Sequence, residues 1–128
     1  MKKEEYDQLS GEILDASITV HQEMGPGLLE SVYQYCLAAE LRSRKIKVEE
    51  QVYVPLFYKG IELKKDFRID LLVENEIIIE TKAVDVLHPV HEAQIISYLK
   101  LSDKRLGFLI NFNVVLLKQG FRRFVNDF

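Results

Sequence analysis

Residues 67–82 read FRIDLLVENEIIIETK, and this stretch decides the fold. Two runs rich in Ile, Leu and Val, residues 67–73 and 77–82, stand on either side of the polar residues 74–76. Apolar and β-branched residues favour strands, and a short polar connection between two such runs favours a hairpin. The stretch therefore predicts two adjacent antiparallel strands.

The lengths of the two runs predict how the strands are paired. If the polar connection is a three-residue loop, Val73 pairs with Ile77, and Asp70 then lies opposite Glu80. Side chains alternate along a strand, so Lys82 points to the same face as Glu80. A slip of one residue would move Asp70 to the other face, so the prediction depends on this register.

Asp70 and Glu80 interrupt apolar runs, which makes them candidates for chemistry. Opposite side chains of a hairpin lie about 4.5–5.5 Å apart at Cβ, and two carboxylates that close repel each other unless a cation joins them. Carboxylate oxygens suit Mg²⁺ or Mn²⁺, which can activate a water while Lys82 stabilises the attacking hydroxide or the charge on a phosphoryl group. The alternative is a surface hairpin in which Lys82 makes an ordinary ion pair.

Helical and strand patterns extend outward from this hairpin. An apolar stripe at steps of three and four from Tyr6 to Val20 predicts a first helix, which the turn at residues 25–27 ends. The other predicted elements are helices over residues 28–44 and 88–101 and strands over residues 48–58, 61–73, 77–82, 106–110 and 114–117. The fold class is therefore α/β, with a mixed β-sheet flanked by helices in the order α-α-β-β-β-α-β-β.

Length and composition are typical of a small globular protein. The chain has 128 residues, of which 48% are hydrophobic and 29% charged, so we expect a single domain over residues 1–128. No apolar run suits a secretory signal or a membrane span. The single cysteine, Cys36, suits a reducing compartment, and we therefore expect a cytoplasmic protein without a membrane partner.

The net charge of −3 argues against a polybasic nucleic-acid binder, because such binding depends on many phosphate contacts. The charge is unevenly distributed, however. Residues 42–68 carry a net +4 and residues 100–123 a net +5, whereas residues 69–99 carry −5. The average therefore conceals two basic regions that suit a nucleic-acid partner.

Two motifs resemble a known protein family. Asp70 followed by Glu80-Thr81-Lys82 resembles the D…ExK core of the PD-(D/E)XK nuclease superfamily. GLLESVY at residues 27–33 is similar to the motif that names the GxxExxY protein family, a branch of that superfamily. The resemblance covers about residues 10–125, and Ile69 stands where the superfamily name has proline, at a position that often varies. Further similarities are His21, the Gly25-Pro26-Gly27 turn, FRID at residues 67–70, the helix with Gln94, Tyr98, Leu99 and Lys100, and LINF at residues 109–112.

This resemblance implies a restriction-endonuclease-like core and Mg²⁺-dependent (or Mn²⁺-dependent) hydrolysis of phosphodiester bonds. The candidate catalytic residues that it implies are Glu30, Asp70, Glu80, Lys82 and Gln94. The first three would hold the metal, Lys82 would polarise the attack, and Gln94 would assist near the scissile bond or position Lys82. The candidate nucleic-acid-binding residues are Arg68, Tyr98 and Lys100.

Three residues upstream keep alternative interpretations. From its spacing alone, Glu30 is also explained as an acid near a helix N-terminus, where the helix dipole favours negative charge. Tyr33 shares a helix face with Glu30, which predicts a packing residue whose hydroxyl orients Glu30 or a strand group. His21 precedes the glycine turn, and we interpret it as a helix-end capping residue, with a contact to the site as the alternative.

The functional hypothesis is a nuclease that acts on nucleic acid. We expect DNA as the substrate, selected by its structure rather than its sequence, and RNA stays open as the alternative. The first alternative is a non-catalytic module that keeps the nuclease fold and binds nucleic acid or protein. The second alternative is a subunit that completes its site by forming a homodimer. Endonuclease and exonuclease activities stay equally open.

Overall fold

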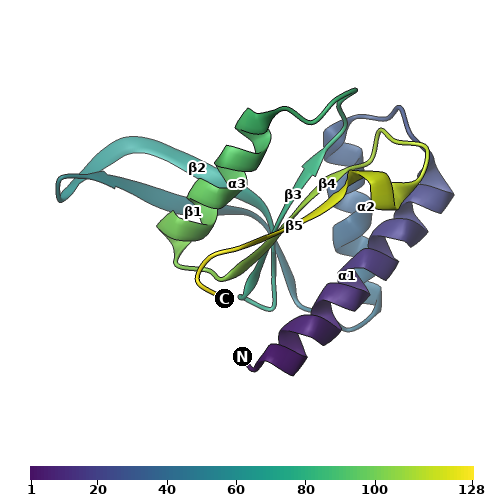
Figure 1. Ribbon diagram of the computed structural model, residues 1–128, viewed down its shortest axis with the longest axis horizontal. Helices are drawn as coiled ribbons and strands as arrows, with labels where there is room; N and C mark the ends of the chain where they lie inside the picture. The colour runs from purple at the N-terminus through teal and green to yellow at the C-terminus, as the bar shows by residue number, and fades with distance from the viewer.

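The strands form one sheet in the same order as they follow one another in the chain, β1-β2-β3-β4-β5 (Figure 1). The computed structural model describes the backbone of residues 1–128 and all side chains except those of residues 64–66. The strands are β1 (Val48–Tyr58), β2 (Ile61–Val73), β3 (Ile77–Lys82), β4 (Leu106–Asn111) and β5 (Phe121–Val125). The helices are α1 (Lys3–Met24), α2 (Glu30–Ser43), α3 (Pro89–Ser102) and the 3₁₀ helix η1 (Leu117–Gly120).

The sheet is mixed, as the sequence predicts. Strands β1, β2 and β3 form an antiparallel meander, and β5 is antiparallel to β4. Strands β3 and β4 are parallel, because α3 carries the chain back across the sheet between them. The predicted order α-α-β-β-β-α-β-β is confirmed, although η1 precedes the last strand and that strand is a different segment from the predicted one.

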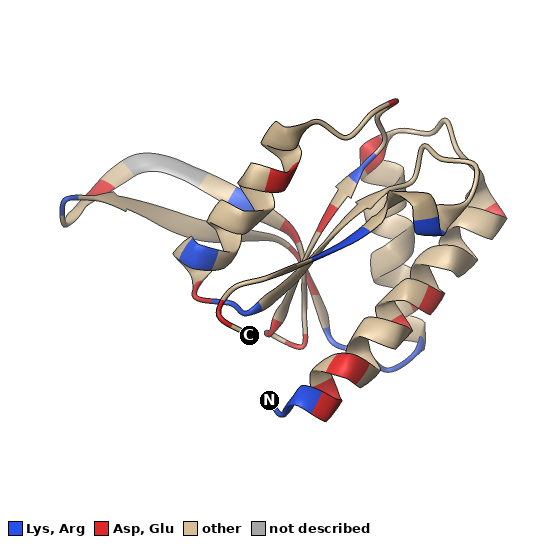
Figure 2. Cartoon of the chain, viewed as in Figure 1, with Lys and Arg blue, Asp and Glu red and all other residues tan. Residues whose placement is uncertain are grey.

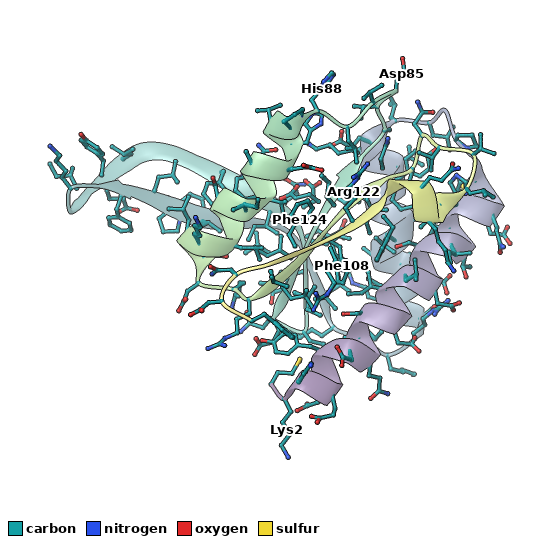
Figure 3. All side chains as sticks on the ribbon, viewed as in Figure 1. Lys2, Asp85, His88, Phe108, Arg122 and Phe124 are labelled. Carbon is teal, nitrogen blue, oxygen red and sulfur yellow. The ribbon has the colours of Figure 1, made fainter. Side chains whose placement is uncertain are left out.

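Helices cover both faces of the sheet (Figure 1). Helices α1 and α2 pack on one face, around a core that contains Tyr33, Phe108 and Phe112. Helix α3 packs on the other face, where Ile95 and Leu99 contact the sheet and other apolar residues, including Phe124, join them. Figure 3 labels Phe108 and Phe124, which pack against the cores on opposite faces of the sheet.

Local sequence explains where the helices begin and end. Gly25 takes a positive φ of 69° directly after α1, and its N–H bonds the carbonyl of His21. His88 precedes α3, and Pro89 occupies its first turn, where the missing N–H costs little. Asp103 ends α3 in the left-handed conformation. The predicted ends of the third helix are confirmed to within one residue.

The end of β1 and the start of β2 form a two-stranded arm that projects from the body of the molecule (Figure 1). Lys59 and Gly60 make its turn, and both have positive φ angles, of 50° and 80°. Phe57, Tyr58 and Ile61 are 59%, 61% and 69% exposed at the end of this arm. The arm therefore presents apolar side chains to solvent instead of burying them.

The predicted strand over residues 114–117 is wrong. Val115 and Leu116 are 84% and 63% exposed, in a loop that the His21 ring holds through the carbonyl of Val114. The last strand is β5, with the sequence FRRFV. Its central arginines are tolerated because β5 lies at the edge of the sheet. The second helix also begins at Glu30 and not at residue 28.

Charge is distributed unevenly over these elements. Figure 2 shows mainly acidic positions along α1, basic positions on β5, and both acidic and basic positions on α3 and on the arm. Among the described residues, no helix is long and apolar enough to cross a membrane.

Candidate active site

Asp70 lies where strands β2 and β3 separate. The paired register runs from Val73 with Ile77 to Leu71 with Ile79, as predicted, and stops there. One oxygen of Asp70, Oδ2, accepts the backbone N–H of Thr81 at 2.9 Å and its hydroxyl at 3.2 Å. The Asp70 carboxylate thus takes the place of the next backbone hydrogen bond between β2 and β3. The register predicted from the sequence brings this carboxylate beside β3.

Glu80 is the buried acid of the site. Its side chain is 4% exposed, and none of the residues that the structure describes makes a hydrogen bond to its Oε1 atom. Burial, together with the charge of Asp70, raises the pKa of Glu80 to about 10, and Lys82 offsets only part of this effect. Glu80 therefore keeps its proton at neutral pH unless a cation binds in place of that proton.

Glu30 and Lys82 form an ion pair next to the two other acids of the site. Lys82 Nζ lies 3.8 Å from Glu30 Oε1, and its side chain is 17% exposed. Burial raises the pKa of Glu30; Lys82 opposes this effect and the charge of Asp70 adds to it. The fold therefore places the first residue of α2 in the same electrostatic environment as the ends of β2 and β3.

Helix α3 supplies a polar stripe on the other side of the sheet. Gln94 Nε2 donates a hydrogen bond of 2.8 Å to the hydroxyl of Tyr98, whose ring stacks on Phe67 at 4.0 Å between centroids. Burial raises the pKa of Tyr98, and the charges of Glu80 and Asp70 raise it further. Tyr98 therefore lies within electrostatic reach of the two carboxylates.

The sequence model of one protein family, the PD-(D/E)XK nuclease superfamily, matches residues 7–124. The chain belongs to the PD-(D/E)XK nuclease superfamily. Its mixed sheet between helices agrees with the restriction-endonuclease-like fold of that superfamily, so the predicted fold class is confirmed. Neither the curated proteins nor the solved structures contain a match to this chain.

Superfamily membership supports a nuclease-like function and a nucleic-acid substrate. Nucleases of this superfamily generally depend on a divalent metal, and two observations show that the donor set fits one. Asp70 and Glu80 offer carboxylate oxygens, the ligands that Mg²⁺ and Mn²⁺ prefer. Glu80 Oε1 has no partner within the described part of the chain. No three acidic, His or Cys side chains there form a ready-made metal cluster.

The tyrosine of the GLLESVY stretch binds the predicted turn at residues 25–27, a contact that the sequence did not predict. The hydroxyl of Tyr33 donates to the carbonyl of Gly25 at 2.5 Å and accepts the N–H of Leu28 at 3.1 Å. Its ring is fully buried and stacks on Phe112 at 4.7 Å. The predicted packing role is confirmed, but the hydroxyl binds the turn before Glu30 and not Glu30 itself.

The remaining candidates are spread around this centre. Arg68 precedes Asp70 by two residues on β2, and Lys100 is exposed in the last turn of α3. Lys100 follows Tyr98 by two residues and therefore points away from the Gln94–Tyr98 stripe. His21 bonds the Val114 carbonyl at 2.8 Å, which is a structural role at the end of α1. The structure thus brings the three acids and Lys82 within electrostatic reach of one another, and Tyr98 within reach of Asp70 and Glu80.

Proposed function

We propose that this chain is a metal-dependent nuclease that hydrolyses phosphodiester bonds of DNA, with Mg²⁺ or Mn²⁺ as its cofactor. The observation that carries the proposal is Glu80: a buried carboxyl beside Asp70 that lacks a partner at Oε1 within the described residues. Two uncharged side chains would stabilise the fold equally well at these buried positions. The presence of two acids there therefore favours a cation-binding role. The active-site residues proposed are Glu30, Asp70, Glu80, Lys82 and Gln94.

Each of these side chains has a separate task in the proposed reaction. Asp70 and Glu80 would hold the metal directly, with Glu30 as the third carboxylate. A bound divalent ion would lower the pKa of the attacking water and neutralise charge on the phosphoryl oxygens. Lys82, which Glu30 holds at 3.8 Å, would stabilise negative charge that develops on the phosphoryl group.

Residues of α3 and β2 would hold the substrate. The Gln94 amide already bonds the Tyr98 hydroxyl, so the pair can offer an ordered donor to a phosphate oxygen or to Lys82. Arg68 and Lys100 would bind phosphates farther along the strand. Because the chain combines a small core with two basic sequence regions, residues 42–68 and 100–123, we propose selection of branched or otherwise distorted DNA.

Membership of the GxxExxY branch is part of the same proposal. The Tyr33 hydroxyl and the positive φ of Gly27, 95°, give the glycine and tyrosine of that motif a physical role, since both shape the turn that leads into Glu30. A cytoplasmic location is proposed from the single cysteine, Cys36.

Cleavage assays with matched variants test this function. We would incubate the purified chain with branched, single-stranded and duplex DNA, and with RNA, in the presence of Mg²⁺, Mn²⁺ or a chelator. We expect divalent-dependent cleavage that Asp70→Asn, Glu80→Gln and Lys82→Met each lower at least about 100-fold. Glu62→Gln, an exposed acid on the arm, is the control and should cleave normally. Cleavage that survives Asp70→Asn would contradict the assignment.

The non-catalytic module is the second candidate, because the described acids form no ready-made metal cluster. Calorimetric titration with Mn²⁺ separates the two functions. Micromolar binding that Glu80→Gln abolishes favours the nuclease, whereas DNA binding without metal binding favours the module. Sedimentation of the same samples tests the proposed homodimer.

A further inference from the structure

Gln51 is a strained residue in the middle of β1. Its φ is +52°, in the left-handed region, although Glu50 and Val52 on either side pair normally with Leu71 and Ile69. A residue other than glycine is uncommon there, and such a conformation costs about 1–3 kcal/mol. Gln51 is also the position that faces Asp70 across the β1–β2 pair. The strain thus occurs at the residue opposite a candidate catalytic acid.

At Gln51 the paired strands β1 and β2 rotate about their long axis, so that their faces exchange sides. Leu71 and Val73 pack with α1 and α2, whereas Ile69 and Val54 pack with α3. In a regular strand, residues 69 and 71 would share one face. The pair must therefore rotate at Asp70, and the left-handed residue on the neighbouring strand lies at the point of rotation. This rotation brings the Asp70 side chain to the place where β2 and β3 separate.

The Gln51 side chain also reaches the site. Its Nε2 atom donates to Gln34 Oε1 at 2.8 Å and lies 3.4 Å from Asp70 Oδ1. Gln34 is one turn beyond Glu30 on α2, so this pair connects the helix to β2. Thr81 donates hydrogen bonds to the other oxygen of Asp70, Oδ2. Thr81 and Gln51 therefore contact different oxygens of the same carboxylate.

We propose that Gln51 is a positioning residue that fixes the Asp70 carboxylate, through its amide backed by Gln34 and through its left-handed backbone. Long hydrogen bonds at such sites commonly tighten once the site is complete, which is consistent with the 3.4 Å contact. Partners of this kind around a ligand typically change metal affinity or activity by about 10–100-fold when they are removed. The effect on cleavage rests on the function proposed above; the effect on the Asp70 conformation does not.

Gln51→Gly tests the backbone and the side chain of Gln51 together, and Gln34→Leu tests the side-chain contact alone. Glycine relieves the backbone strain and removes the amide, so we expect unchanged or greater stability together with about tenfold lower kcat and about tenfold weaker Mn²⁺ binding, at unchanged KM. Gln34→Leu leaves β1 intact and should give a smaller loss in the same direction. Combined with Gln51→Gly, it should add little, because both act on one contact.

Lys45→Gly is the matched control, because Lys45 has a similar φ of 66° and lies outside the site. It should change stability in the same way as Gln51→Gly and leave kcat and Mn²⁺ affinity unchanged. A Gln51→Gly variant with normal kcat and Mn²⁺ affinity overturns the proposal, and so does a rise confined to KM, which would indicate a substrate contact. If the parent chain neither cleaves nor binds Mn²⁺, the proposed function fails. Crystal structures then decide the inference: Asp70 turned away from Thr81 in Gln51→Gly supports it, and an unmoved carboxylate refutes it.

Discussion

Glu80 is a carboxyl group whose position in the fold opposes its own ionisation. It is buried beside Asp70, and these two causes raise its pKa to about 10 from an ordinary value near 4.5. Without metal, the folded chain therefore keeps a proton that the unfolded chain releases above its ordinary pKa. The stability that this proton provides is complete at acidic pH and is lost as pH rises toward 10.

We predict that Glu80→Gln removes this pH dependence. In the presence of a chelator, the unfolding free energy of the parent chain should fall between pH 6 and pH 9 by up to about 1.4 kcal/mol per pH unit more than that of the variant. Urea unfolding at several pH values measures the difference. Glu49→Gln, which changes an exposed acid, should behave like the parent chain. Parallel curves for the parent chain and Glu80→Gln would contradict the raised pKa.

At this scale the sequence predicted the strand pairing around the candidate residues better than how their side chains are held. The register of Asp70 and Glu80 followed from loop length and strand alternation, and the structure confirms the pairing of Val73 with Ile77. The strain at Gln51 was not predictable, because a left-handed glutamine has no signature in the sequence. The ion pair of Glu30 with Lys82 also depends on how α2 packs against the sheet.

Among the elements, β4 and η1 approach each other too closely for any side chain at Gly120. A Cβ atom on Gly120 would lie 2.1 Å from the backbone oxygen of Asn111. Asn111 also holds the segment after Lys82, since its amide accepts the N–H of Val84 at 3.1 Å and donates to its carbonyl at 2.9 Å. The 3₁₀ helix therefore supports the end of β3 through a glycine.

We predict that Gly120→Ala destabilises the chain by about 3 kcal/mol, because backbone atoms must move to admit the methyl group. Gly107→Ala is the control, since its nearest neighbour is the flexible tip of Ile95 at 3.2 Å, and it should cost less than about 1.5 kcal/mol. Thermal and urea unfolding of both variants measure these effects. Equal stabilities of the two variants would show that η1 can move away from β4.

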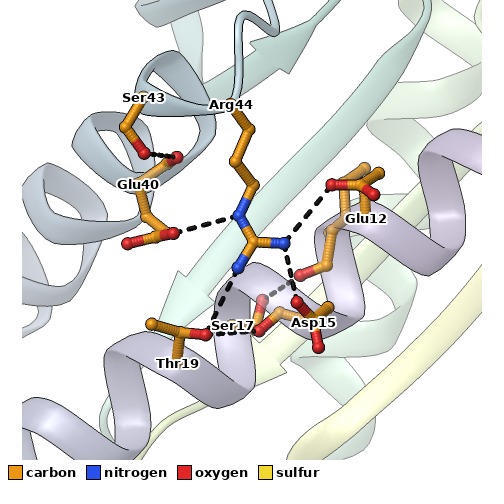
Figure 4. A network of polar contacts seen from close by, with 8 residues as sticks. Glu12, Asp15, Ser17, Thr19, Glu40, Ser43 and Arg44 are labelled. Carbon is orange, nitrogen blue, oxygen red and sulfur yellow. Dashed lines mark hydrogen bonds and ion pairs between the residues drawn. The ribbon is translucent and has the colours of Figure 1, made fainter.

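Helices α1 and α2 are joined by one arginine with several partners (Figure 4). Arg44 bonds Asp15 at 2.7 Å, Glu40 at 3.0 Å, and both Glu12 and Thr19 at 3.3 Å. These partners come from both helices, and the carboxylates of Asp15, Glu40 and Glu12 raise the already high pKa of the guanidinium. The network therefore uses the planar fork of arginine, which lysine lacks.

Arg44→Lys should lower the unfolding free energy by about 1 kcal/mol and Arg44→Leu by about 2 kcal/mol, since the carboxylates lose their shared cation. The difference between Arg44→Leu and the parent chain should shrink in 1 M salt, where exposed charges are screened. Urea unfolding at low and high salt measures it. A deficit that does not change with salt would indicate lost packing of the alkyl chain instead of lost ion pairs.

Secondary structure was predictable wherever hydrophobic periodicity was strong, and it failed at the carboxyl-terminal end. Residues 114–117 are apolar yet form a loop, because Val115 and Leu116 extend into solvent while His21 holds the backbone. Strand β5 has two arginines at its centre and no regular alternation of buried and exposed positions. An edge strand needs little burial, so its pattern resembles that of a surface loop.

For the molecule as a whole, the arm is the part that extends farthest from the core (Figure 1). Its exposed Phe57, Tyr58 and Ile61 contribute little to folding, and the Lys59 ammonium lies 5.4 Å from the Tyr58 ring centre. Aromatic side chains next to cations suit contact with unpaired bases.

We predict that the triple variant Phe57→Ser, Tyr58→Ser, Ile61→Ser keeps its unfolding free energy within about 1 kcal/mol of the parent chain and binds single-stranded or branched DNA about tenfold more weakly. Fluorescence anisotropy measures the affinity, and sedimentation of the same samples reports association between copies. A change in sedimentation with unaltered DNA affinity would assign the arm to a homodimer interface instead.

The matching order of strands in the sheet and in the chain has a consequence for biosynthesis. Each new strand pairs with the one made just before it, so the sheet can grow by simple addition as the chain leaves the ribosome. Asp70, Glu80 and Lys82 belong to the meander, which leaves the ribosome ahead of α3, and only the parallel β3–β4 contact must wait for a helix to be completed. The strands that carry the candidate acids thus leave the ribosome early, and β5 joins the edge of the sheet last.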